Sequence, residues 1–242
     1  IQDTNQMPLS RAFILGSLIM AIAIIISPLI YGGAKGNYAQ ETQNRQGNLA
    51  ENQNLTDSEI DPNVDPNILT IKEDDHVMGA KNPKITFIEY SDYDCPFCSR
   101  IHPTMQQLVE TYPEDVAWIY RHFPLESIHP NARQKSLASE CIALLGGEDA
   151  FWTYTDTQFS GQQIQEAQLL ALTGVDVGEF TTCIENQTTA SRVDRDINDA
   201  IALGIQGTPY TIALLPNGET LSISGAQPYE VFEELVKAVI EK

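Results

Sequence analysis

Apolar and polar positions divide the chain into three stretches of different character. Residues 12–30 form an uncharged apolar run, close to the ~20 residues that a helix needs to cross a bilayer. The next stretch, up to residue 67, is rich in Asn, Gln, Gly and Glu and poor in large apolar side chains, which is typical of a flexible linker. After it, strand and helix periodicities alternate to the end of the chain. We therefore divide the chain into a membrane anchor or signal segment (1–31), a linker (32–67) and a folded domain (68–242).

The first segment has two interpretations. A cleaved signal peptide has a shorter apolar region, of ~7–15 residues, that ends at a small-residue cleavage site. The longer run here favours a retained single-pass helix that anchors the domain to the membrane. The flanking charges, Arg11 before the run and Lys35 and Arg45 after it, do not fix its orientation.

The first half of the folded domain has the pattern of a strand–helix–strand unit. Residues 68–72 alternate weakly and predict an edge strand. Residues 85–90 and 116–122 are rich in β-branched and aromatic side chains, which predicts two strong strands. A helix is expected between them, up to about residue 112. Its buried face would carry Ile101, Met105 and Leu108.

The second half begins with a long helical region and returns to strands. Residues of about 130–203 are predicted to be helical, with apolar stripes that include two of the cysteines. Strands are expected at 209–215 and 219–224, joined by a Pro-Asn-Gly turn, and an amphipathic helix ends the chain. The pattern predicts an α/β fold in which a helical insertion separates a βαβ half from a ββα half. The stripes are Leu137, Cys141 and Leu144; Phe180, Cys183 and Ile184; and Val231, Leu235, Val236, Val239 and Ile240.

The charge balance argues against one class of partner. Acidic residues number 33 against 14 basic ones, a formal net charge of −19. A chain this acidic repels phosphate backbones, so no nucleic acid partner is expected.

The segment Cys95-Pro96-Phe97-Cys98 follows the strand at 85–90 after a short polar turn and opens the helix. That placement is typical of a thiol–disulfide redox pair. Pro96 suits the first helical position, so Cys95 would lie at the helix N terminus. Unpaired N–H groups and the helix dipole stabilise a thiolate there, and Cys98 one turn later can close a disulfide.

Two features near this motif leave questions open. Glu89, Asp92 and Asp94 place negative charge close by, which disfavours a thiolate, while Arg100 and His102 are candidates to offset it. A zinc site is the alternative use of two cysteines. It would need His102 together with Cys141 or Cys183 as further ligands, and no second metal-ligand pair occurs.

A second landmark, Gly207-Thr208-Pro209, leads into the strand expected at 209–215. Proline is tolerated at the first residue of a strand, and a cis bond at this point would turn the backbone. Taken alone, a trans turn proline is the simpler interpretation.

Several of these segments together resemble a known family. Residues 85–98, ITFIEYSDYDCPFC, resemble the active-site strand and motif of DsbA-like proteins of the thioredoxin superfamily. Further similar motifs, in the same order, are RHFPL at 121–125, IHPNA at 128–132, Phe180-x-x-Cys183 and GIQGTP at 204–209. The resemblance covers about residues 68–242 and implies a thioredoxin fold with a helical insertion.

The resemblance also implies roles for five residues. Cys95 would be the exposed nucleophile and Cys98 the resolving thiol. Pro209 would be a cis-proline packed against the disulfide, and the backbone of Thr208 would pair with substrate. Glu89 matches a buried acid that assists proton transfer, although an exposed strand glutamate is the alternative.

One position departs from the family pattern. Well-studied oxidases of the family carry His as the second residue between the two cysteines, where this chain has Phe97. The oxidising power of those proteins is therefore not transferred to this chain.

The remaining cysteines and histidines are expected to be structural. In an exported protein a bridge between Cys141 and Cys183 is preferred over two buried free thiols. His76, His122 and His129 show no metal-ligand spacing, and no catalytic role is assigned to them. No cofactor is expected.

Three functions follow as hypotheses. The leading one is an extracytoplasmic oxidase, anchored to the cell membrane, that transfers the Cys95–Cys98 disulfide to reduced exported proteins. The resemblance implies that a quinone-linked membrane partner recharges it. A reductase or isomerase with the same chemistry is the first alternative. The second is a tethered binding or chaperone module whose motif forms a structural disulfide.

Overall fold

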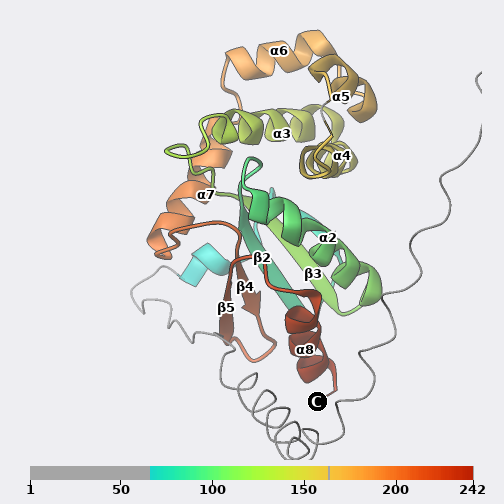
Figure 1. Ribbon diagram of the computed structural model, residues 1–242, viewed down its shortest axis with the longest axis vertical. Helices are drawn as coiled ribbons and strands as arrows, with labels where there is room; N and C mark the ends of the chain where they lie inside the picture. Colours follow the sequence, from blue (N-terminus) through green and yellow to red (C-terminus); the bar gives the residue numbers. More distant parts are fainter. Residues whose placement is uncertain (1–65, 163, 242) are drawn as a thin grey trace, which may run out of the picture. The chain divides into compact units, whose positions relative to one another are not determined.

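The computed structural model describes residues 66–162 and 164–241, which contain a five-stranded sheet in the order β1-β3-β2-β4-β5 (Figure 1). The parallel strands β2 (Ile85–Ser91) and β3 (Val116–His122) lie side by side within it. Both strands are buried along their whole length, as strands covered on two faces must be. β1 (His76–Gly79) pairs antiparallel with β3 at one edge. β4 (Tyr210–Leu214) and β5 (Thr220–Ser224) extend the sheet antiparallel from β2.

Helices cover both faces of this sheet. On one face, α2 (Pro96–Thr111) and α8 (Tyr229–Ile240) share a core with alternate residues of the strands. Phe87 of β2 meets Phe232 of α8 edge to face, with ring centroids 5.6 Å apart. On the opposite face, Ile88 and Ile212 pack with Ala200 of α7 (Ala190–Ala202). The strand–helix–strand and strand–strand–helix halves predicted from the sequence are thus confirmed.

Between β3 and β4 the chain forms helices, as predicted for residues 130–203. They are α3 (Ala132–Gly146), α4 (Glu148–Phe159), α5 (Glu166–Thr173), α6 (Val177–Glu185) and α7. Figure 1 shows α3, α4, α5 and α6 grouped at one end of the sheet, beyond the N-terminal end of α2. This insertion therefore lies next to the start of the helix that carries the cysteine motif.

The predicted edge strand at 68–72 is wrong. Residues Pro66–Leu69 form a short 3₁₀ helix, η1, and the edge strand is β1 further along the chain. The reason is Arg121, a fully buried side chain whose guanidinium donates to the carbonyls of Ile68 and Thr70 and to the carboxylate of Asp75. Those carbonyls satisfy a buried charge, so they are not available for a strand ladder.

A buried polar cluster joins the insertion to the sheet. Glu140 of α3 accepts from His76 of β1 at 3.1 Å and from His122 of β3 at 2.8 Å. Burial lowers the pKa of His76, but its bonds to Glu140 and Glu148 outweigh burial and raise that pKa to about 9. The charged partners make this cluster a structural link between α3 and two strands.

The predicted apolar stripes need two corrections. In the stripe predicted for α3, Cys141 is buried as expected. Leu144 is 60% exposed, because the buried face of the helix runs through Ser136 and Glu140 instead. In α8 the fully buried residues are Phe232 and Val236, so the stripe is centred on an aromatic residue that the pattern left out.

The expected anchor (1–31) and nearly all of the expected linker (32–67) lie outside the described residues. Within 66–162 and 164–241, no helix is both long and apolar enough to cross a bilayer.

Candidate active site

Cys95 is the N-cap residue of α2, with an extended backbone, and Pro96 follows at the start of the helix. The Cys95 carbonyl accepts the backbone N–H groups of Cys98 and Ser99, which begins the helical hydrogen-bond pattern. The Cys95 side chain itself makes no cap bond to the backbone. Both cysteines are free thiols, with Cys95 4% and Cys98 0% exposed. Both cysteines are therefore buried, Cys98 completely. The expectation that Cys95 is exposed is wrong, because the loop that carries Thr208 lies against its sulfur.

The loop before β4 lies directly against Cys95. The Thr208–Pro209 peptide bond is cis, and the Cys95 thiol donates a hydrogen bond to the Thr208 carbonyl over 3.3 Å. The two residues are 113 positions apart in sequence. The fold thus brings together the two segments that the sequence singled out separately.

The pKa values of the two thiols are shifted in opposite directions from that of an ordinary thiol. The pKa of Cys95 is lowered to about 5. The largest cause is the hydrogen bond with the Cys98 thiol, and Thr208 and the N–H groups of Cys98 and Phe97 add to it, while burial opposes the shift. Burial, reinforced by the charges on Cys95 and Glu89, raises the pKa of Cys98 far above that of an ordinary thiol. At neutral pH the reduced pair therefore carries its single negative charge on Cys95.

Glu89 of β2 is buried, with 1% of its surface exposed, and interacts electrostatically with both cysteines. Burial raises its pKa to about 7, and the nearby Ser91 hydroxyl and Trp118 indole offset only part of that rise. In the described part of the chain, Glu89 Oε2, Ser91 Oγ and Trp118 Nε1 are buried without a hydrogen-bond partner. A buried carboxyl that titrates near neutral pH next to Cys98 is suited to exchange a proton with it.

Two other acidic residues near the motif are bonded to basic side chains that the sequence did not suggest. Asp92 is fully buried and bonded to His129 over 2.8 Å. Asp94 forms an ion pair with Lys135 over 2.6 Å. The charge of Lys135 therefore offsets that of Asp94, and Asp92 is bonded to an imidazole whose pKa this bond raises.

Arg100 and His102, the residues expected to offset those acids, contact other side chains. The guanidinium of Arg100 lies 5.0 Å from the ring centre of Phe97, which is 50% exposed. The buried imidazole of His102 is bonded to Asp156 of α4 over 2.8 Å. Phe97 and Arg100 thus present an apolar and cationic surface beside Cys95.

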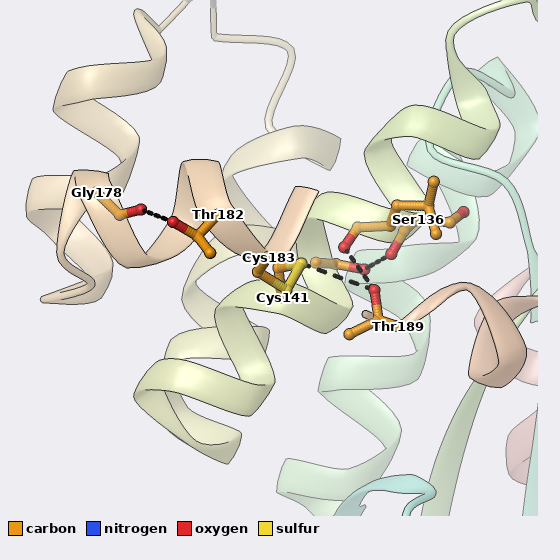
Figure 2. Close-up of a disulfide and its surroundings, with 8 residues drawn as sticks. Ser136, Cys141, Gly178, Thr182, Cys183 and Thr189 are labelled. Carbon is orange, nitrogen blue, oxygen red and sulfur yellow. Dashed lines mark hydrogen bonds between the residues drawn. A yellow bond between two sulfur atoms is a disulfide. The ribbon is translucent and has the colours of Figure 1, made fainter. Parts of the chain in front are cut away.

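Cys141 of α3 and Cys183 of α6 are joined by a disulfide, with Cα atoms 5.9 Å apart (Figure 2). The Thr189 hydroxyl lies 3.7 Å from the sulfur of Cys141. With these two cysteines bonded and His102 held by Asp156, the additional ligands of a zinc site are engaged elsewhere. Within the described ranges, no group of three or more His, Cys, Asp or Glu side chains is arranged to hold a metal.

Sequence reasoning missed His129, Lys135 and Ser91 as members of the site. His129 shows no metal-ligand spacing in the sequence, so it is given no catalytic role there, although it belongs to the motif IHPNA. Ser91 lies two residues after Glu89 on the same face of β2, and that alternation was a usable signal. For Lys135 the sequence carries no signal, because its contact with Asp94 depends on how α3 is placed.

A sheet of this order, with a cysteine pair at the first turn of α2 and a cis-proline against it, defines a dithiol protein of thioredoxin type with a helical insertion. Comparison with known proteins agrees with this class. A sequence profile described as thioredoxin matches residues 71–238, and the chain belongs to that family.

Solved structures match the DsbA-like form of the fold. DsbA2 of Pseudomonas aeruginosa is 24% identical, with a TM-score of 0.61 over 72% of this chain and 98% of that one. A periplasmic thioredoxin-like protein of Salmonella enterica serovar Typhimurium is 22% identical, with a TM-score of 0.57 over 73% and 95%. The thiol–disulfide exchange protein α-DsbA2 of Wolbachia pipientis is 18% identical, with a TM-score of 0.54 over 67% and 85%. These likenesses support a DsbA-like fold.

Among curated proteins, the chain is similar to part of larger ones. It is 33% identical over 153 residues to a Na⁺/H⁺ antiporter, NhaA 1, of Mycolicibacterium gilvum. The match covers 61% of this chain and 24% of the antiporter, so the chain spans about a quarter of that relative.

Proposed function

We propose that this protein is an extracytoplasmic thiol–disulfide oxidoreductase that transfers the Cys95–Cys98 disulfide to reduced exported proteins. The observation that carries the proposal is the Cys95 sulfur, which lies at the start of α2 with a pKa lowered to about 5 and against the carbonyl of Thr208. The thiolate exists only in the reduced protein. Whatever stabilises it therefore favours reduction of the protein and oxidation of the client.

The reaction proceeds in two exchanges. A client thiolate attacks the Cys95 sulfur of the disulfide, the Cys95–Cys98 bond breaks, and its electron pair leaves on Cys98. A second client thiolate then attacks the client sulfur of the mixed disulfide, and Cys95 leaves as a thiolate. The client loses two electrons and gains a disulfide, while the protein gains the two electrons.

Glu89, Thr208 and Pro209 assist these steps in our proposal. Because the pKa of Cys98 is strongly raised, this sulfur requires a proton as it leaves, and the neutral carboxyl of Glu89 supplies it. The Thr208 backbone, next to cis-Pro209, pairs with the extended client chain beside Cys95.

The cellular setting is also part of the proposal. A disulfide between Cys141 and Cys183 persists in an oxidising compartment, and one of the structural relatives is described as periplasmic. We place the domain (68–242) outside the cytoplasm, held by the segment at 1–31 and the linker at 32–67. A quinone-linked membrane protein would reoxidise it.

The reduction potential and the oxidation of a reduced client test this proposal together. The potential is measured against glutathione, and the client is an unfolded protein with two thiols. We expect catalytic oxidation and a potential in the glutathione range or above. A potential near that of thioredoxin, about −270 mV, would instead assign the protein to the reductases. If no thiol–disulfide exchange occurred at Cys95, the protein would instead be assigned as a binding module.

A further inference from the structure

The loop between β3 and α3 contains a histidine that the proposed reaction does not use. His129 Nδ1 lies 2.8 Å from Asp92 Oδ2, 37 positions away in sequence. The same buried carboxylate accepts the backbone N–H groups of Leu125 at 2.8 Å and Asp94 at 2.7 Å. The carbonyl of Asp92 accepts the N–H of Cys95 at 3.1 Å. Asp92 therefore ties the turn that carries the nucleophile to the loop that carries His129.

The charges around His129 favour its protonated form. Its hydrogen bond to Asp92 raises its pKa, partial burial opposes the rise, and the negative charges of Asp92, Cys95 and Asp94 add to it. Lys135, which also lies near the site, is paired with Asp94. Without a partner, the fully buried charge of Asp92 would act against a thiolate three residues away.

We propose that His129 is a positioning residue for the reactive thiolate: its imidazolium, fixed by the buried carboxylate of Asp92, supplies positive charge to Cys95 from outside the Cys95–Cys98 motif. The inference rests on the proposed function, because the charge matters only where a thiolate forms. Since Cys95 carries that charge only in the reduced protein, His129 favours the reduced state and makes the disulfide a stronger oxidant.

The first test compares His129→Gln with Lys84→Gln. Glutamine can still donate to Asp92 but carries no charge. Lys84 lies just before the first residue of β2, at the end of the strand away from Cys95. It is exposed and pairs with Asp115 over 2.9 Å, so Lys84→Gln controls for the loss of one positive charge. The pKa of Cys95 is followed by the ultraviolet absorbance of the thiolate in reduced protein. We expect a rise of about one unit in His129→Gln and at most a few tenths in Lys84→Gln.

The equilibrium with glutathione should change in the same direction. A thiolate stabilised about tenfold less makes the His129→Gln disulfide less oxidising by about 30 mV. A His129→Gln protein with the wild-type pKa and the wild-type potential would overturn the proposal.

The second test needs no variant. In unaltered protein, the pKa of the His129 imidazole is measured by nuclear magnetic resonance in the reduced and oxidised states. We expect a higher pKa in the reduced state, because only that state carries the Cys95 thiolate. Equal values contradict the inference even if client oxidation proceeds. Conversely, a redox-dependent His129 in a protein that oxidises no client would contradict the proposed function and leave this inference standing.

Discussion

The two cysteine pairs of this chain contain the same functional groups and differ in what surrounds their sulfurs. Cys95 precedes the first turn of α2, where N–H groups at the helix start are unpaired, and it faces the loop at Thr208. Cys141 and Cys183 lie within α3 and α6, where backbone N–H groups are bonded inside the helices, and they bond to each other (Figure 2). Placement along a helix, more than the presence of two thiols, therefore separates a reactive pair from a structural one.

Removing the sulfur at position 95 is the most severe way to test this comparison. In a Cys95→Ser variant we expect oxidation of a reduced client to fall to the uncatalysed rate, because no disulfide can then form with Cys98. The rate is measured by the loss of client thiols. A variant that still oxidised the client as fast as the wild type would show that Cys141 and Cys183 carry the activity.

Titration of the reduced protein distinguishes the reactive thiol from an ordinary one. With a pKa of about 5, Cys95 is almost entirely thiolate at pH 7, whereas an ordinary thiol with a pKa of about 8.5 is only a few per cent thiolate. We expect its thiolate absorbance to appear around pH 5 and to change little between pH 7 and pH 8. The Cys95→Ser variant is the control. If the absorbance rose only near pH 8.5, the Cys95 thiol would be an ordinary one and the pair would not be a reactive one.

The bridged pair should matter for stability and not for exchange. It closes a loop with a sequence separation of 42 residues, worth roughly 4 kcal/mol in the chain-entropy estimate. Changing both cysteines to alanine avoids a stray thiol, and denaturant unfolding should show a loss of up to about that size. Client oxidation under native conditions should stay within about twofold of wild type. A loss of oxidation without a loss of stability would contradict the structural role.

The buried acid near the reactive pair, Glu89, should make the stability of the protein depend on pH. Its pKa is higher in the folded chain, about 7, than the ordinary value of 4.5, so the folded state binds the proton more tightly. The resulting stabilisation is present at low pH and is lost as pH rises from about 4.5 to about 7, a change on the order of 3 kcal/mol.

A Glu89→Gln variant removes this titration. In a background where Cys95 and Cys98 are both serine, the unfolding free energy should fall less between pH 5 and pH 8 in Glu89→Gln than in the matched Glu89 protein. His76 titrates equally in both, so the difference isolates Glu89. Parallel pH profiles would show that the carboxyl is not held neutral by burial.

Much of the fold could be predicted because its signals are local. The runs at 85–90 and 116–122 predicted strands correctly, since central strands need apolar side chains on both faces. The strand predicted at 68–72 is wrong because no local sequence signal shows that Arg121 binds the carbonyls of this segment. The predicted burial of Leu144 is wrong because helical spacing does not show which face of α3 packs against a neighbour.

The order of strands and helices, the helical insertion and the place of Cys95 at a helix start follow from the amino-acid sequence, because backbone periodicity and proline geometry act over a few residues. The packing of the folded chain brings Thr208 against Cys95, His129 against Asp92 and Lys135 against Asp94. Such contacts join residues tens of positions apart. They depend on how every helix packs on the sheet, and that packing is distributed over the whole core instead of being encoded at any one site.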